Sequence, residues 1–432
     1  MGDFLEELRW RRLLHEAMPE TDALLKAGPV KGYIGFDPTA DSLGVGNLVQ
    51  VMTLLHFQRA GHIPFALMGG ATGMVGDPSG KSEERNLLTS DTLAQNLAGQ
   101  KKQLERFLDF SPSGGAQLVN NYDWFSQVRF LDFIRDAGKH ISVNYMLRKD
   151  SVRNRIEKSD EGMSFTEFTY QLIQGWDFYW LYKHHGVKLQ MGGSDQWGNI
   201  TTGTELIRRK EGSEAKAYAI TTPLITKGDG TKFGKTEKGN VWLDAKRTSP
   251  YEFFQFWLNA SDDDVKNYIR IFTLLDRATV EGLEAEHAAA PHERKLQKTL
   301  ARDITVRVHG QEQLDVALAA TEVLFGKGTI DQLKALSEEQ FVQVFVGAGV
   351  RVAEVPRDAF GGGVPVIELF SEKSQLAASK GEARKLLESN ALSINKAKVA
   401  DTKATVGADQ LINGRYLLLQ KGKKDYCLVK AV

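Results

Sequence analysis

Short, mostly apolar segments alternate with amphipathic segments through the first half of the chain. The apolar segments are four to seven residues long and end in Gly, Asp or Asn, as buried strands do. The segments between them carry apolar residues at helical spacing. The predicted strands are 30–36, 63–68, 117–120 and 187–191, and the predicted helices are 47–60, 89–108 and 124–138. Buried strands that alternate with helices are typical of a parallel sheet covered on both faces, so we predict an α/β fold with a Rossmann-like, doubly wound sheet.

The pattern changes after residue 220, and we expect further domains there. Apolar positions at helical spacing fill most of 249–346, and a Gly-rich segment follows. The last part has a predicted helix at 381–389, a strand at 392–395 and a hairpin built from 415–420 and 425–429. The expected divisions are a Rossmann-like domain at 1–220, a connector at 221–248, a helical domain at 249–346, a linker at 347–363 and a small α+β domain at 364–432. Helices are also expected within residues 1–28.

Charge is balanced over the whole chain but not along it. Residues 371–432 hold 12 Lys and Arg against 6 Asp and Glu, a net charge of +6, so the first 370 residues carry −6. A basic tail on an acidic body indicates a polyanionic partner. The single cysteine, Cys427, excludes an intrachain disulfide and fits a reducing cytoplasm. No segment has the length of a membrane span, and no metal-ligand spacing such as CxxC or HExxH occurs.

A glycine-rich turn joins the first predicted strand to its helix. The stretch 31–48 is a strand, an Asp-Pro-Thr break, glycines and a helix start. Free N–H groups at a helix start bind phosphates, although many such turns hold glycine for geometry alone, and both interpretations stay open on this stretch. Comparable turns lie at 69–81 and 192–199, and all would meet at the carboxyl edge of the sheet.

Two further segments carry candidate chemistry. Tyr170, Gln174 and Asp177 share one helix face, and the large aromatic residues around them favour a buried polar pocket over a solvated surface. The segment 225–240 holds four glycines and four lysines, without hydrophobic periodicity. It is either a mobile basic loop that meets a ligand or an ordinary solvated turn.

Five segments in this order resemble the bacterial tyrosyl-tRNA synthetases, a class I family. They are Tyr33–Leu43, Gly69–Lys81, Phe165–Gln174, Gly192–Ile200 and Lys232–Thr236, and the last 60 or so residues resemble an S4-type RNA-binding domain. The resemblance implies a ligase that activates tyrosine with ATP·Mg²⁺ and transfers it to tRNA(Tyr). It also implies a homodimer in the cytoplasm, with no tightly bound metal and no membrane partner.

The resemblance implies a role for each matching residue. Three groups of residues would contact phosphates in catalysis. They are Lys232, Lys235 and Thr236 in the segment 225–240 (the lysine loop), Thr39 in the first turn, and Lys81 and Arg85 in a second basic loop. Tyr33 and Asp177 would bind the phenolic hydroxyl of tyrosine. The rest of the tyrosine site would be Asp77, Tyr170 and Gln174 at the ammonium group, and Gln190. ATP would be held by Gly35, Asp37, Gly44, Gly46, Asn47, Gly192, Asp195 and Gln196.

One position departs from the family pattern. The helix after the first turn normally begins with a His-x-Gly-His signature, and here the stretch is Gly44-Val-Gly-Asn47. A lost donor to transition-state phosphate oxygens costs on the order of 10²–10³ in rate. Gly44 therefore indicates a slow site, a substitute donor or an engineered change, and the sequence leaves these open. If no other group fills the role, Gly44→His would raise the activation rate at least tenfold.

Two other functions stay under consideration. A non-catalytic RNA-binding paralogue would explain Gly44 together with the basic tail. A tryptophan-specific relative is disfavoured by Tyr33 and Asp177, because an indole offers a donor but no acceptor.

Overall fold

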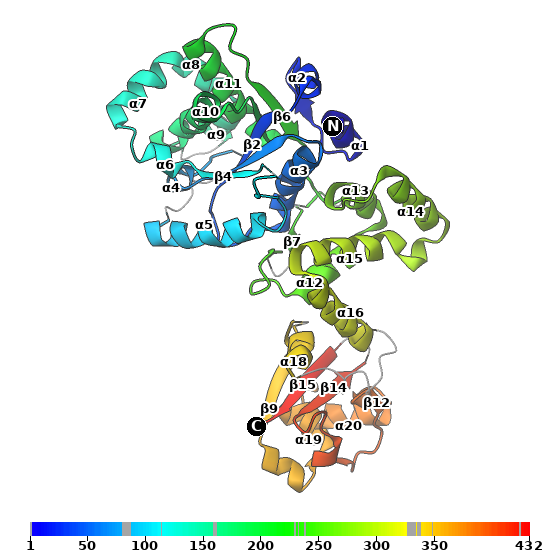
Figure 1. Cartoon of the computed structure of the whole chain (residues 1–432). Helices are drawn as coiled ribbons and strands as arrows, with labels where there is room; N and C mark the ends of the chain where they lie inside the picture. Colours follow the sequence, from blue (N-terminus) through cyan, green and yellow to red (C-terminus); the bar gives the residue numbers. More distant parts are fainter. Residues whose placement is uncertain are drawn as a thin grey trace. The chain divides into compact units, whose positions relative to one another are not determined.

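The computed structural model of the chain forms two compact units (Figure 1). Unit 1 comprises Met1–Asp244 and Asn259–Val308, and unit 2 comprises Ala245–Leu258 and His309–Val432. The range 249–346, expected as one helical domain, thus contributes to both units. The structure describes residues 2–79, 88–113, 115–158, 162–228, 230–231, 233–236, 239–325, 334, 338–347, 349–422 and 425–432.

A six-stranded sheet forms the centre of unit 1, with the strand order β1-β6-β5-β2-β3-β4. Its strands are β1 Glu16–Ala17, β2 Lys31–Phe36, β3 Ile63–Met68, β4 Gln117–Asn120, β5 Leu189–Gly193 and β6 Tyr218–Thr222. All neighbouring pairs are parallel except β1 with β6. The predicted parallel sheet is therefore confirmed. The edge strand β1 lies where only helices were expected, because two residues are too short to leave a periodic pattern.

Strand β2 sets the register of the sheet. Tyr33 lies opposite Phe65 of β3 on one side and Gln190 of β5 on the other. Parallel pairing brings the ends of these three strands, at Phe36, Met68 and Gly193, to the same edge of the sheet.

Unit 1 also contains helices. They are α1 Phe4–Trp10, α2 Thr21–Ala27, α3 Leu48–Arg59, α4 Thr72–Val75, α5 Ser90–Leu104, α6 Tyr122–Phe125, α7 Phe130–Asp136, α8 Val143–Leu147, α9 Asp150–Lys158, α10 Phe165–His185, α11 Trp197–Glu211, α13 Asp262–Phe272, α14 Arg277–Ala289 and α15 Lys295–His309. The helix expected at 124–138 is wrong as one element: it is divided into α6 and α7, because Arg129 adopts an extended conformation.

Helix α10 has strong sequence-encoded ends. At its start the Ser164 side chain accepts from the Glu167 N–H, and the Glu167 carboxylate accepts from the Ser164 N–H, which forms a capping box. At its end Gly186 adopts the left-handed conformation, with φ of 68°. These ends fix the helix that carries Tyr170, Gln174 and Asp177.

A buried arginine fixes α13 to the N-terminal helix. The Arg11 guanidinium donates to the backbone carbonyls of Arg270, Thr273 and Leu275 at 2.7, 2.8 and 2.9 Å. These carbonyls lie at and beyond the end of α13, where backbone acceptors lack helical partners. Arg11 is 2% exposed, so it closes this helix end inside the protein.

Unit 2 contains helices and a second sheet. The helices are α12 Pro250–Leu258, α16 Gln311–Phe325, α18 Glu338–Gly347, α19 Val366–Glu368 and α20 Lys380–Glu388. The five-stranded sheet has the order β12-β11-β14-β15-β9, with β9 Arg351–Val355, β11 Leu392–Ile394, β12 Ala397–Lys398, β14 Tyr416–Lys421 and β15 Asp425–Ala431. Two further strands of two residues each, β10 Val364–Pro365 and β13 Thr405–Val406, form a separate antiparallel pair.

The predicted hairpin of the last domain is confirmed as β14 and β15. Residues 351–355 fall within the range expected to be a linker, but they form β9 and pair in parallel with β15. This part of the range therefore belongs to the C-terminal sheet. Its pairing partner lies some 70 residues further on, a long-range contact that no local pattern reveals.

Candidate functional site

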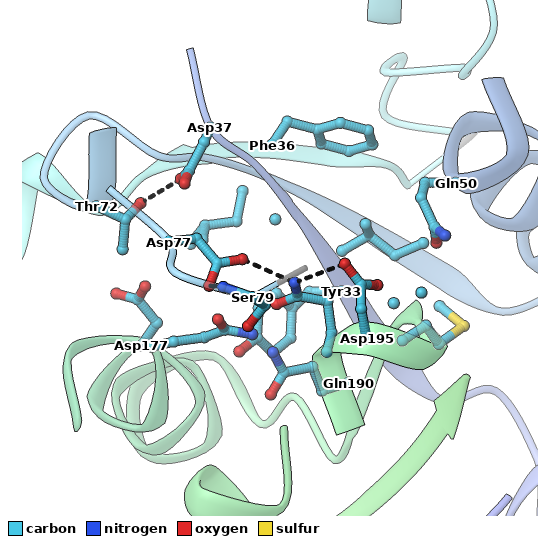
Figure 2. Close-up of a pocket in the computed structure, with 18 of the residues that line it drawn as sticks. Tyr33, Phe36, Asp37, Gln50, Thr72, Asp77, Ser79, Asp177, Gln190 and Asp195 are labelled. Carbon is cyan, nitrogen blue, oxygen red and sulfur yellow. Dashed lines mark hydrogen bonds between the residues drawn. The ribbon is translucent and has the colours of Figure 1, made fainter. Parts of the chain in front are cut away.

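A cavity of about 360 Å³ lies where β2, β3 and β5 end (Figure 2). Thirteen of the predicted site residues line it: Tyr33, Gly35, Asp37, Thr39, Asn47, Asp77, Tyr170, Gln174, Asp177, Gln190, Gly192, Asp195 and Gln196. The strand ends and the polar face of α10 thus meet at one place, as the sequence predicts.

One end of this cavity offers a buried carboxyl. Asp177 is fully buried, and its two oxygens accept from Trp124 Nε1 at 2.9 Å and Asn121 Nδ2 at 3.0 Å. Burial raises the pKa of Asp177 to about 8, against the effect of the two hydrogen bonds, which lower it. The charge of Asp37 raises it further.

A tyrosine hydroxyl shares that end of the cavity. Tyr33 is 1% exposed, and its hydroxyl has no hydrogen-bond partner in the described part of the chain. Burial, and then the charge of Asp177, raise the pKa of Tyr33 well above its ordinary value, so the hydroxyl keeps its proton. Gln190 Oε1 is likewise buried and unpartnered. The cavity therefore presents donors and acceptors for a neutral hydroxyl of a ligand.

Carboxylates surround the rest of the cavity. Asp37 accepts from the Tyr170 hydroxyl at 2.9 Å and from Thr72 at 2.7 Å. In Figure 2, Asp77 and Asp195 point toward one amide nitrogen, that of Gln196, at 2.7 and 3.5 Å. Three carboxylates around one space favour a ligand that carries a cation.

A second cavity of about 200 Å³ shares Asp37, Thr39 and Asn47 with the first. Gly44, Gly46 and Lys235 also line it. Its wall is the turn Val45–Asn47, which leads into α3, so the positive end of the α3 dipole lies there. This wall suits phosphate oxygens, and the phosphate interpretation of the turn gains support from it.

The backbone does not require glycine at position 44. Gly44 has φ of −91° and ψ of 168°, which is ordinary extended conformation. A Cβ placed on it would lie 3.4 Å from the Val241 carbonyl oxygen, an ordinary contact. The missing side chain is therefore a chemical difference and not a geometric necessity.

The lysine loop is anchored on α13 and on the turn before α3. The ring of Phe233 packs against Phe272 at 5.3 Å and Tyr268 at 4.9 Å between centroids. Gly234 has φ of +82°, and a Cβ there would lie 2.8 Å from Val45 Cγ2, so this position does require glycine. Between these anchors and β8 (Gly239–Asn240), Lys235 is held at the second cavity.

Some predicted residues lie elsewhere. Thr236 lines neither cavity, and its hydroxyl donates to the Gly239 carbonyl at 3.1 Å. Lys81, Arg85 and Lys232 lie outside the described residues.

Other residues of the site escaped the sequence analysis. Asn121 and Trp124 donate to Asp177, and Thr72 donates to Asp37. Asn121 directly follows β4 at the same sheet edge as the three glycine turns, and this position could have identified it.

In the parts of the chain that the structure describes, no group of three or more His, Cys, Asp or Glu residues could hold a metal ion. Over the same residues, no helix combines the length and apolar character needed to cross a bilayer.

Comparison with known proteins gives matches over nearly the whole chain. Residues 25–326 match the family model of class I tRNA synthetases (W and Y), and residues 350–429 match the SYY-like C-terminal domain of tyrosine–tRNA ligase. The tyrosine–tRNA ligase of Cytophaga hutchinsonii is 55% identical over 433 residues, covering 100% of both chains. That of Bacteroides fragilis is 56% identical over 432 residues, covering 99% of this chain and 100% of the relative.

A solved structure agrees with these matches. The C-terminally truncated mitochondrial tyrosyl-tRNA synthetase of Aspergillus nidulans superposes with a TM-score of 0.65 at 32% identity, covering 73% of this chain and 92% of that one.

The raised pKa of Asp177 gives a pH-dependent prediction. The carboxyl ionises near 3.8 when unfolded but near 8 when folded, so the folded protein holds one more proton between these values. The free energy of unfolding should therefore fall as pH rises from 5 to 8, by up to about 1.4 kcal/mol per pH unit from this group. Asp177→Asn should remove that part of the slope, measured by urea unfolding at several pH values.

The matched control is Asp132→Asn, which changes an exposed carboxyl on α7. It should leave the slope unchanged. An Asp177→Asn variant with the same slope as the unmodified chain would contradict the proposed protonation of Asp177.

Proposed function

The chain belongs to the tyrosine–tRNA ligase family of class I tRNA synthetases, and from this we propose how it acts. It binds L-tyrosine in the first cavity and ATP, as its Mg²⁺ complex, across both cavities. The tyrosine carboxylate attacks the α-phosphate to give tyrosyl-adenylate and pyrophosphate, and the tyrosyl group then passes to the 3′-terminal ribose of tRNA(Tyr). The protein supplies positions and charge stabilisation in both steps.

The observation that carries this proposal is the pair formed by Tyr33 and Asp177. A phenolic hydroxyl placed between them donates to an oxygen of the Asp177 carboxyl group and accepts from the Tyr33 hydroxyl. Phenylalanine would leave the Tyr33 hydroxyl without a partner and Asp177 with one hydrogen bond fewer, which costs free energy, and would therefore be rejected. The unpartnered, buried Tyr33 hydroxyl supports this arrangement.

The remaining groups of the first cavity support the position of the amino acid and the ribose. Asp77, Tyr170 and Gln174 lie along the cavity, where a carboxylate-rich wall suits the tyrosine ammonium group. Asp195 and the Gly192 backbone, at the end of β5, are placed for the ATP ribose. Reaction at the α-phosphate then falls between the two cavities, beside Asp37 and Thr39.

Lys235 lies in the second cavity, where it would stabilise the charge that develops on pyrophosphate. By resemblance, Lys232 with Lys81 and Arg85 would join it. Lys235 belongs to a small two-stranded ladder anchored through Phe233, an arrangement that supports a loop able to move while its base stays fixed.

The C-terminal domain is proposed to bind tRNA. Lys380, Arg415, Lys421 and Lys430 are engaged in ion pairs with nearby glutamates. Arg384 and Lys385 are exposed on α20, where no ion pair involves them within the described residues. Exposed cations of this kind are suited to contacts with phosphates. The use of tRNA and the single cysteine, which is buried, support a cytoplasmic location.

We propose a homodimer on the basis of an apolar surface. Eight large apolar side chains between residues 122 and 165 are exposed, and Phe130 and Leu131 are 67% and 76% accessible. They are Tyr122, Phe130, Leu131, Ile134, Val143, Leu147, Ile156 and Phe165. A concentration of exposed apolar residues in one segment is typical of a protein–protein interface.

A second candidate function, an RNA-binding paralogue with negligible adenylate formation, is motivated by Gly44. Tyrosine-dependent exchange of pyrophosphate into ATP distinguishes the two functions. We expect the unmodified chain to catalyse exchange with tyrosine, and not with phenylalanine or tryptophan. Exchange no faster with tyrosine than without it would contradict the ligase function.

The same assay tests Tyr33. Tyr33→Phe should reduce the preference for tyrosine over phenylalanine by about fivefold, since one hydrogen bond between uncharged groups contributes about 1 kcal/mol. Tyr182→Phe removes a hydroxyl from α10 outside the cavity and should leave the preference unchanged. An unchanged preference in Tyr33→Phe would exclude this hydroxyl from recognition.

The tRNA contact is tested by reversing charge on α20. Arg384→Glu combined with Lys385→Glu should raise the KM for tRNA about tenfold and reduce its log–log salt dependence by up to about two, because each lost phosphate contact contributes about one. Tyrosine-dependent exchange should not change. Lys102→Glu, on the exposed side of α5, is the matched control. Equal loss of exchange and charging would refute a separate tRNA-binding role.

The homodimer is tested by placing charge in the apolar surface. Phe130→Asp with Leu131→Asp should convert a particle of two 48.0 kDa chains into one, measured by light scattering after size exclusion. Val352→Asp changes an exposed apolar residue of β9 and should leave the mass unchanged. A monomeric unmodified chain, or a dimeric double variant, would contradict this interface.

A further inference from the structure

The second cavity contains a row of positions that face the same way. The segment 43–45 runs antiparallel to 241–243: the Val45 N–H donates to the Val241 carbonyl at 3.0 Å, and the Leu243 N–H donates to the Leu43 carbonyl at 2.9 Å. Gly44 is thereby paired with Trp242. Paired residues on antiparallel strands project to one face, and so do residues two apart on one strand. Asn240 therefore projects to the face on which a side chain at position 44 would lie.

The other neighbour of Asn240 lies on the same face. In the short ladder of β7 Lys235–Thr236 with β8 Gly239–Asn240, Lys235 pairs directly with Asn240. Val241, between Asn240 and Trp242, is 5% exposed, so it is buried, although it also borders the second cavity. Lys235, Asn240 and Trp242 all line the second cavity together with Gly44.

The spacing also fits. Diagonal neighbours across an antiparallel pair, such as positions 44 and 240, lie about 7–8 Å apart, within reach of side chains that converge on one phosphate group. The Asn240 side chain is exposed, and its carboxamide nitrogen carries two donor hydrogens. Asn47, by contrast, uses its Oδ1 to accept from the Gly44 N–H at 3.0 Å and so holds the turn.

We infer that Asn240 is a catalytic residue whose carboxamide donates to the ATP phosphates in place of the side chain that Gly44 lacks. The inference rests on the proposed function. Lys235 supplies the positive charge, and Asn240, directly opposite, supplies a neutral donor to the same leaving pyrophosphate. The donor thus comes from β8 and not from the helix start, and it lies on the same face of the cavity as a side chain at position 44 would.

A double-mutant cycle tests this inference through the rate of tyrosine-dependent pyrophosphate exchange. Asn240→Ala should lower kcat about 100-fold, the typical loss of one transition-state donor, with little change in the KM for ATP. Asn240→Asp, which keeps the shape but removes both donor hydrogens and adds negative charge, should be at least as slow. Gly44→His should change kcat less than threefold alone, but should raise it at least tenfold in the Asn240→Ala background.

Rescue by a histidine across the strand pair is the result that a merely structural role would not give. Thermal unfolding of each variant shows that the fold is kept, and Gln311→Ala, which removes an exposed carboxamide from α16 in unit 2, is the matched control. A loss below tenfold in Asn240→Ala would overturn the inference, as would failure of Gly44→His to rescue. Absence of exchange in the unmodified chain would instead contradict the proposed function, and the inference with it.

Discussion

The parallel pairing of β2 with β3 on one side and with β5 on the other is the constraint on which the site depends. It brings three strand ends to one edge, and each strand continues there into a turn that carries polar side chains. Asp37, Asp77 and Asp195 are far apart in sequence and meet only because of this register. A shift of one residue in β2 would turn Tyr33 to the other face of the sheet and remove it from the cavity.

The same edge accepts a buried carboxyl that would be costly elsewhere. Asp177 is stabilised by Asn121 and Trp124, and the pKa of its carboxyl is nevertheless raised, so two hydrogen bonds do not offset its burial. A ligand hydroxyl would add a further hydrogen bond to Asp177. In the proposed function, selectivity for tyrosine follows from the Tyr33 hydroxyl, which has no partner among the described residues, and from the further hydrogen bond that Asp177 can accept.

The sequence predicts the parallel sheet, the turns and most of the first cavity, because strand periodicity and glycine positions are local features. It does not predict β1 or β9, since their existence depends on partners about 70 to 200 residues away. Asn121 and Trp124 were missed because their role arises from proximity to Asp177 and not from any motif. Asn240 was missed for a related reason: its register opposite Lys235 and beside Gly44 exists only in the folded chain.

Strand β9 also has a consequence for how the chain is made. It pairs with β15, so it has no partner until about 70 further residues have been translated, roughly 4–14 s at 5–20 residues per second. All strands of the sheet in unit 1 are complete by Thr222, well before that point. A ribosome-bound chain can therefore carry the finished sheet of unit 1 while its C-terminal sheet is still incomplete. Premature termination within the last strand would leave β9 as an unpaired edge, and such chains are targets for aggregation and proteolysis.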